Sequence, residues 1–242
     1  MIEIWKGYER NDFIFENRSS ILVKPKKPLK GNLWVWRAEF FDAFPSVDMA
    51  LLEKGYFLVY HYVSNMYGCP KSIDLMHNFY LYMIKEFELS AKPEIFGFSR
   101  GGLYAANFAA RYSSYINVLY LDAPVLDIKS WPGGKGRGLN SANEWKECLE
   151  CYGLNEETVM TFKENPIDKA EFLAEHKIPV ILVVGDADDL VPYEENGEIF
   201  DKLYRKKGDH IKTIIKPGVG HHPHSLQDPT SIVDFILSYP IQ

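Results

Sequence analysis

The residues Gly97-Phe98-Ser99-Arg100-Gly101-Gly102 contain the pattern G-x-S-x-G, which can present a reactive serine. An apolar, strand-like run over residues 94–98 leads into the serine, and a helical pattern over residues 103–111 follows it. The glycines permit a strand-to-helix turn that is too sharp for side chains at their positions. The positive end of the following helix would favour the negative charge that forms when a hydroxyl attacks a carbonyl. This context predicts that Ser99 is a nucleophile.

A nucleophilic serine needs a base, and the base needs a group that orients it. Two downstream loops could supply both: residues 185–192 follow a strand-like run at 180–184, and residues 217–222 follow a run at 211–215. Because parallel strands end at one edge of a sheet, both loops would share that edge with Ser99. The candidate acids and bases in these loops are Asp186, Asp188, Asp189, His221 and His222.

The histidines of the second loop also allow an interpretation as a metal site, because His221, His222 and His224 lie close together in the sequence. Catalytic zinc needs three well-placed ligands and an open position, and an HHxH loop alone lacks a partner motif such as H-E-x-x-H. Cys148 and Cys151 have C-x-x-C spacing but lie in a helical pattern, without a second cysteine pair. We therefore predict no metal and no organic cofactor.

The elements that would position these residues alternate between strand and helix from residue 46 onward. Residues 1–36 combine short apolar runs with turn signals, and we expect a few short antiparallel strands there that end at residues 33–36. Later strands are expected at 56–60, 94–98, 118–121, 180–184 and 211–215, and helices at 46–55, 72–89, 101–112, 193–206 and 230–238. The alternation predicts an α/β fold with a mostly parallel sheet and helices on both faces.

One segment interrupts this alternation. Approximately residues 124–178 contain helical stretches, one of which begins with the capping pair Ser141 and Glu144, but no good strand. An insertion after a central strand usually overhangs the site of an open α/β sheet. We expect a single domain over residues 1–242 that carries this segment as a small helical cap.

The composition is that of a soluble globular domain, with 242 residues of which 46% are hydrophobic and 25% charged. The net charge of −6 disfavours a nucleic-acid-binding role, and the one dense basic run, residues 24–28, is interrupted by proline. No apolar stretch is long enough for a membrane span, and no secretory signal is visible. Three cysteines suit a reducing compartment, so we expect a cytoplasmic protein.

These motifs together resemble those of the α/β-hydrolases, in particular the serine esterase and prolyl-oligopeptidase-like group, and the resemblance covers nearly the whole chain. In that group the acid lies in a G-x-x-D-x-x-V-P stretch, which matches Gly185, Asp188, Val191 and Pro192 here. A G-x-G-H loop of the group matches residues 218–221. The resemblance implies that Asp188 is the acid, ahead of Asp186 and Asp189, and that His221 is the base, ahead of His222.

The oxyanion hole of this fold uses the backbone N–H of the residue after the nucleophile, which is Arg100 here, and a second N–H from the loop after an earlier strand. Lipases often have an HGG-type stretch in that loop, and this chain departs from it. We expect Trp36 or Arg37 to supply the second donor. Trp131, in the expected cap, and His222 are predicted to contact the substrate.

The expected activity is hydrolysis of small or carbohydrate-linked carboxylic esters through an acyl-enzyme. Arg37 and Arg100 beside the oxyanion hole favour a polar or anionic ester, because arginine binds carboxylates with its planar fork. A peptidase of the same fold, or a small-molecule receptor on a hydrolase scaffold, are the alternatives. The sequence specifies neither the acyl and alcohol groups nor the oligomeric state.

Overall fold

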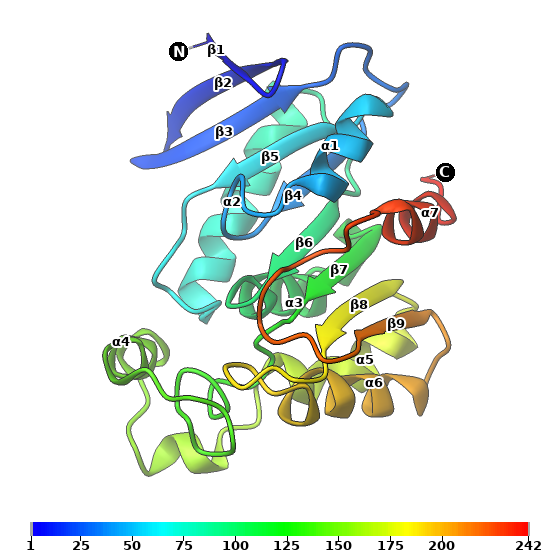
Figure 1. The fold of residues 1–242 in the computed structure, drawn as a ribbon. Helices are drawn as coiled ribbons and strands as arrows, with labels where there is room; N and C mark the ends of the chain where they lie inside the picture. Colours follow the sequence, from blue (N-terminus) through cyan, green and yellow to red (C-terminus); the bar gives the residue numbers. More distant parts are fainter. Residues whose placement is uncertain (1, 242) are drawn as a thin grey trace.

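A computed structural model describes residues 2–241, within which nine strands form one sheet in the order β1-β2-β3-β5-β4-β6-β7-β8-β9 (Figure 1). The strands are β1 (Ile2–Trp5), β2 (Tyr8–Phe15), β3 (Arg18–Lys24), β4 (Trp34–Arg37), β5 (Phe57–His61), β6 (Glu94–Phe98), β7 (Val118–Asp122), β8 (Val180–Gly185) and β9 (Ile211–Lys216). The first three strands are antiparallel, β3 pairs antiparallel with β5, and β4 to β9 are parallel. The predicted fold class is confirmed.

The expectation that residues 33–36 end the antiparallel group is wrong. β4 lies in the middle of the sheet and pairs in parallel with β5 on one side and β6 on the other. The helix between β4 and β5 makes a crossover, and a crossover connection joins parallel strands. β4 is therefore the first strand of the parallel part.

Helices cover both faces of the sheet. They are α1 (Ser46–Glu53), α2 (Pro70–Glu86), α3 (Gly101–Arg111), α4 (Ala142–Tyr152), α5 (Ala170–Glu175), α6 (Gly197–Arg205) and α7 (Thr230–Leu237), with short 3₁₀ turns η1 (Ser113–Tyr115), η2 (Thr158–Thr161), η3 (Pro166–Lys169) and η4 (Tyr193–Glu195). α1 and α7 contact each other on one face, and α2, α3, α5 and α6 share the core on the other face.

The central strands are buried on both faces because successive side chains point to opposite sides. In β7, Leu119 and Leu121 enter the core shared with α2 and α3, whereas Val118 and Tyr120 enter the core shared with α1 and α7. All five residues of β6 and of β7 are buried. The ends of these strands are therefore rigidly held, and the loops that follow them start from fixed points.

The segment between β7 and β8 has two parts. α4 lies beyond the carboxyl ends of the parallel strands, at the lower left of Figure 1, and ends at Gly153 in a left-handed conformation. α5 instead packs against α3 and α6, so it belongs to the helical layer on the sheet. Only the first part of the expected cap therefore projects from the sheet.

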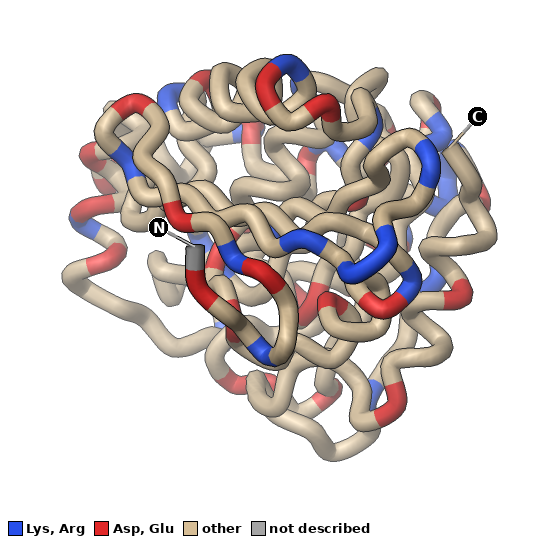
Figure 2. Tube along the Cα trace, turned by 90° about the horizontal axis from the view of Figure 1, so that it is seen from above, with Lys and Arg blue, Asp and Glu red and all other residues tan. Residues whose placement is uncertain are grey.

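Positively and negatively charged residues are interspersed along the chain in the view of Figure 2. Among the described residues, no helix combines the length and the apolar character that a membrane crossing requires.

Candidate active site

Ser99 lies at a tight turn between β6 and α3, and its backbone has a positive φ of 49°. Its N–H donates to the carbonyl of Asp122 at 2.9 Å, and its carbonyl accepts from the N–H of Val125 at 2.9 Å. These bonds hold an unfavourable backbone conformation in place, as is common at functional sites. The turn thus fixes where the hydroxyl points.

Gly97 of the motif and Gly102, directly after it, lie so close to neighbouring atoms that the turn leaves no room for side chains there. A Cβ at Gly97 would lie 2.7 Å from the carbonyl oxygen of Gly101, and a Cβ at Gly102 would lie 2.6 Å from the Cβ of Pro124. Distances this short do not occur between a real Cβ and its neighbours. Both positions therefore require glycine for the helix to start directly at the strand end.

The structure brings Ser99, His221 and Asp188 together in one chain of hydrogen bonds. His221 Nε2 lies 2.9 Å from Ser99 Oγ, and His221 Nδ1 lies 2.7 Å from Asp188 Oδ2. Asp188 is 6% exposed, and its other oxygen accepts from the backbone N–H groups of Leu190 and Val191 at 2.9 and 2.8 Å. In such an arrangement the carboxylate fixes the histidine tautomer, and Nε2 can accept the serine proton.

The other two candidate acids lie away from this chain of bonds. Asp186 is exposed and accepts from the N–H of Gly218 at 2.6 Å, so it closes the turn that carries the histidine loop. Asp189 is also exposed, and its carbonyl accepts from the N–H of Leu139. Of the three aspartates, the geometry selects Asp188.

A second histidine–aspartate pair, which the sequence interpretation missed, lies beside the first. Asp122 at the end of β7 is fully buried, and its Oδ1 lies 2.8 Å from His224 Nδ1. The hydroxyl of Tyr120 and the N–H of Ser225 both donate to its Oδ2, at 2.5 and 2.8 Å. The sequence feature that could have predicted this pair is an aspartate at the end of a strand, at the same sheet edge as the histidine loop.

The structure places Trp36 and Arg37, the expected second oxyanion donors, in the middle of the sheet. Both residues lie within β4, which pairs with β5 and β6 on its two sides, so their backbone N–H groups belong to the sheet. The Trp36 side chain is 1% exposed and packs edge-on against Phe108. The expectation that Trp36 or Arg37 supplies the second oxyanion donor stays a prediction, and this strand pairing disfavours it.

Arg37 is also not available to bind an anionic substrate, because its side chain is 1% exposed. It pairs with buried Asp48 at 3.4 Å and donates to the carbonyls of Phe40 and Ala43 at 3.0 and 2.7 Å. Its guanidinium lies 3.9 Å from the centre of the Phe98 ring. Arg37 thus supports the loop over residues 38–45 from within.

Arg100, like Arg37, pairs with a buried carboxylate, in this case that of Glu39. Its guanidinium lies 3.3 Å from Glu39, whose side chain is 2% exposed, and stacks near the rings of Phe40 and Tyr67. Burial raises the pKa of the Glu39 carboxyl, although the charge of Arg100 partly opposes that shift. Arg100 directly precedes α3, and its backbone N–H makes no backbone hydrogen bond within the described chain.

A cavity of about 240 Å³ opens beside the serine. Aromatic and apolar side chains form most of its wall, and the lining comprises Phe40, Ala43, Phe44, Phe98, Ser99, Leu190, His221, His222 and His224. His222 is exposed and stacks on Phe44 with ring centres 5.7 Å apart. Trp131 does not line this cavity, but packs near Tyr67 with ring centres 6.4 Å apart.

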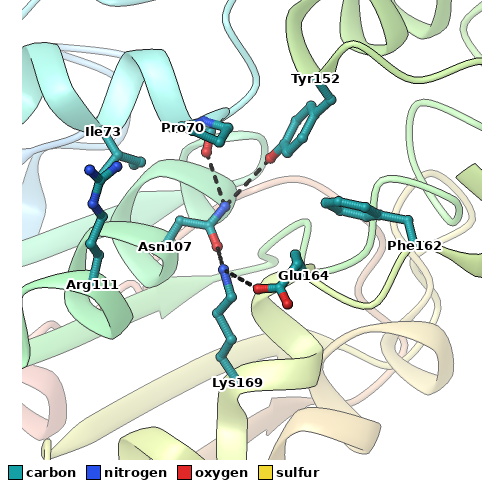
Figure 3. A pocket seen from close by; sticks show the side chains of 9 residues that line it. Pro70, Ile73, Asn107, Arg111, Tyr152, Phe162, Glu164 and Lys169 are labelled. Atoms are coloured by element: carbon teal, nitrogen blue, oxygen red, sulfur yellow. Dashed lines mark hydrogen bonds and ion pairs between the residues drawn. The ribbon is translucent and has the colours of Figure 1, made fainter.

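Figure 3 shows a different cavity, of about 210 Å³, which involves α2, α3 and the segment after α4. Its polar groups pair with one another: Asn107 donates to the carbonyl of Gly68 at 3.0 Å, and Lys169 donates to Asn107 at 3.2 Å and lies 3.7 Å from Glu164. Its lining includes no serine and no histidine. The cavity beside Ser99 is therefore the candidate for hydrolytic chemistry.

Comparisons with known proteins agree with this fold. A search of curated proteins finds no match for the chain. Among solved structures, Est1E from Butyrivibrio proteoclasticus has 22% identity and a TM-score of 0.66, with 99% of this chain and 98% of that chain covered. The Pyrococcus furiosus esterase Pf2001 has 16% identity and a TM-score of 0.64, with 99% and 97% covered.

A peptidase also has this fold. The puromycin-hydrolyzing peptidase of Mycobacterium tuberculosis has 14% identity and a TM-score of 0.70, with 95% of this chain but only 38% of that chain covered. At sequence level, the prolyl oligopeptidase family matches residues 75–239, which include the serine turn, both later loops and more than half of the chain. This match, on a mostly parallel sheet flanked by helices, shows that the chain belongs to the prolyl oligopeptidase family of α/β-hydrolases.

Proposed function

We propose that the protein is a serine esterase that cleaves small carboxylic esters through an acyl-enzyme. The observation that carries this proposal is the chain of hydrogen bonds from Ser99 Oγ through His221 to buried Asp188, at the wall of a cavity. Ser99 is the nucleophile, His221 the general base and Asp188 the orienting acid. The reaction on these three residues needs no metal and no organic cofactor.

The reaction has two halves. Ser99 Oγ attacks the ester carbonyl carbon while His221 Nε2 takes the hydroxyl proton, and the tetrahedral intermediate then expels the alcohol, which receives that proton from His221. In the second half, His221 removes a proton from water, which attacks the acyl carbon. The acid then leaves, and Ser99 regains its proton.

Two backbone N–H groups would stabilise the oxyanion of both intermediates. We propose the N–H of Arg100 as one donor and an N–H from Glu39–Phe40 as the other. A Cβ at Gly101 would lie 3.1 Å from Glu39 Cβ, and Phe40 lines the cavity with Ser99, so this stretch of the loop lies next to the serine turn. The buried Arg37 and the Arg100–Glu39 pair support the loop from two sides.

An ester is favoured over a peptide by the size and lining of the cavity. The cavity is small and apolar, which suits a short acyl group. A peptidase with the same three residues is the second candidate, because the chain belongs to a family named after one.

The proposal is tested by labelling and turnover. Wild-type protein should react with a fluorophosphonate probe and hydrolyse short-acyl nitrophenyl esters faster than aminoacyl nitroanilides. Ser99→Ala should lose both the label and the turnover, whereas Ser114→Ala, a change at an exposed serine, should keep both. Comparable turnover by Ser99→Ala would contradict the nucleophile. Labelling combined with faster anilide hydrolysis would favour the peptidase, and absence of labelling would favour a non-catalytic receptor.

A further inference from the structure

Three histidines meet at the cavity beside Ser99. One ligand nitrogen from each of His221, His222 and His224 lies within 4.8 Å of the others. All three side chains line the same cavity, and His222 is exposed to solvent. The esterase chemistry proposed above uses only His221. It does not explain why the rings of His222 and His224 lie beside it.

Two of the rings are oriented as zinc-binding histidines usually are. Asp188 holds Nδ1 of His221 at 2.7 Å, and Asp122 holds Nδ1 of His224 at 2.8 Å. In metal sites a carboxylate of this kind takes the N–H of one ring nitrogen, so that the other nitrogen offers its lone pair to the metal. Here both carboxylates leave Nε2 as that second nitrogen.

We propose that these three histidines form an inhibitory binding site for a zinc ion. Zinc is bound by histidine nitrogens at about 2.0–2.1 Å in a tetrahedral arrangement, which places the ligand nitrogens about 3.4 Å apart. The ligand nitrogens lie within 4.8 Å of one another, so binding requires the rings to move closer together, and the exposed His222 side chain has room to rotate. A water molecule would complete the tetrahedron.

Inhibition follows from competition for one lone pair. His221 Nε2 is the atom that accepts the Ser99 proton in the proposed reaction, and it is 2.9 Å from Ser99 Oγ. A zinc ion on that nitrogen removes the acceptor, so the serine hydroxyl stays protonated and unreactive. This step rests on the proposed function, whereas binding of the ion does not.

Binding is therefore tested on Ser99→Ala protein, which keeps all three histidines and has no turnover to interfere. Calorimetry with Zn²⁺ should give one site per chain, and Co²⁺ should give the visible absorption of a tetrahedral complex. Adding His222→Ala should weaken Zn²⁺ binding at least tenfold, because one of three ligands is lost. His176→Ala, a change at an exposed histidine outside the cluster, should leave it unchanged. No binding, or binding indifferent to His222→Ala, would overturn the site.

Inhibition is tested on wild-type protein with a short-acyl ester. Zn²⁺ should abolish turnover at saturation and EDTA should restore it. In His222→Ala the half-inhibitory Zn²⁺ concentration, relative to the metal-free rate of that variant, should rise by the same factor as the dissociation constant. Binding without inhibition, or activation by Zn²⁺, would overturn the inhibitory role. A protein that binds Zn²⁺ at the three histidines but hydrolyses no ester would support the site and contradict the proposed function instead.

Discussion

Asp188 and Asp122 are both buried carboxylates that hold a histidine, but only the histidine of Asp188 reaches Ser99. Each aspartate follows or ends a parallel strand, so the sheet brings both to the same edge. Which aspartate contacts which histidine depends on the path of the loop after β9, and sequence spacing does not specify that path. The pair Asp122 and His224, which are 102 positions apart, illustrates this limit.

Replacing Asp188 and Asp186 one at a time tests which carboxylate orients His221. Asp188→Asn should lower kcat for a short ester by about 10⁴-fold, because the amide favours the wrong histidine tautomer. Asp186→Asn should change kcat less than tenfold, since its exposed carboxylate accepts from the backbone N–H of Gly218 and lies outside the chain of bonds from Ser99 to Asp188. Steady-state kinetics of both variants, with circular dichroism to verify folding, measures the difference. A larger loss in Asp186→Asn would show that Asp188 is not the orienting acid.

Arg37 shows why a charged residue next to a predicted site need not face it. The sequence places Arg37 next to a predicted strand, but does not indicate that the following loop turns back and covers its side chain. The buried carboxylate of Asp48, which the guanidinium meets, comes from α1. Burial raises the pKa of that carboxyl, and the charge of Arg37 opposes the shift. The pair is therefore part of the support of the loop rather than a contact for substrate.

At the scale of elements, the strand that leads to Ser99 was the most predictable part of the molecule. Continuous apolar runs bounded by turn residues gave β6 with both of its observed ends, and gave β7 to within one residue. In the inserted segment, the pair Ser141 and Glu144 predicted the start of α4 correctly, whereas the start of η3 was less predictable because it depends on tertiary contacts. Asn165 and Asp168 form the capping box of η3, and the Asn165 side chain also accepts from the N–H of Ile128 at 3.1 Å.

Glu94, the first residue of β6, makes the free energy of unfolding depend on pH. Glu94 is fully buried, and burial raises the pKa of its carboxyl to about 8, against the opposing effect of a hydrogen bond from Asn117. Between the ordinary glutamate pKa, near 4.5, and pH 8, the folded protein holds a proton that the unfolded chain has lost. The contribution of Glu94 to the free energy of unfolding therefore decreases as pH rises through this window.

Glu94→Gln removes this dependence, because the amide stays neutral and can still accept from Asn117. The melting temperature of the variant should exceed that of the wild type by several degrees at pH 8, with a much smaller difference at pH 5. Thermal denaturation at the two pH values measures this, with Glu53→Gln, at an exposed position, as the control. An equal effect of Glu94→Gln on the melting temperature at both pH values would show that the pKa of Glu94 is not raised.

At the scale of the whole molecule, the sheet, the loop supported by Arg37 and the histidine loop together enclose a short cavity. Its volume of about 240 Å³ lies below the range of about 300–1,000 Å³ that is typical of sites for drug-sized ligands. The sequence could not predict this volume, because the cavity is formed by loops from distant parts of the chain. Phe40 and Phe44 come from the loop after β4, Leu190 from the loop after β8 and His222 from the loop after β9.

For the proposed esterase, the size of this cavity predicts which esters are hydrolysed. Nitrophenyl esters with acyl chains of two to four carbons should have at least a tenfold higher kcat/KM than the ten-carbon ester, because a longer chain cannot be buried beside Ser99. Leu190→Ala enlarges the cavity while the backbone N–H that donates to Asp188 stays in place. The variant should therefore reduce the ratio between short and long esters, whereas Leu139→Ala, at a residue 59% exposed and outside the cavity, should leave it unchanged. A wild-type preference for the ten-carbon ester, or a ratio that Leu190→Ala does not move, would show that the acyl group binds elsewhere.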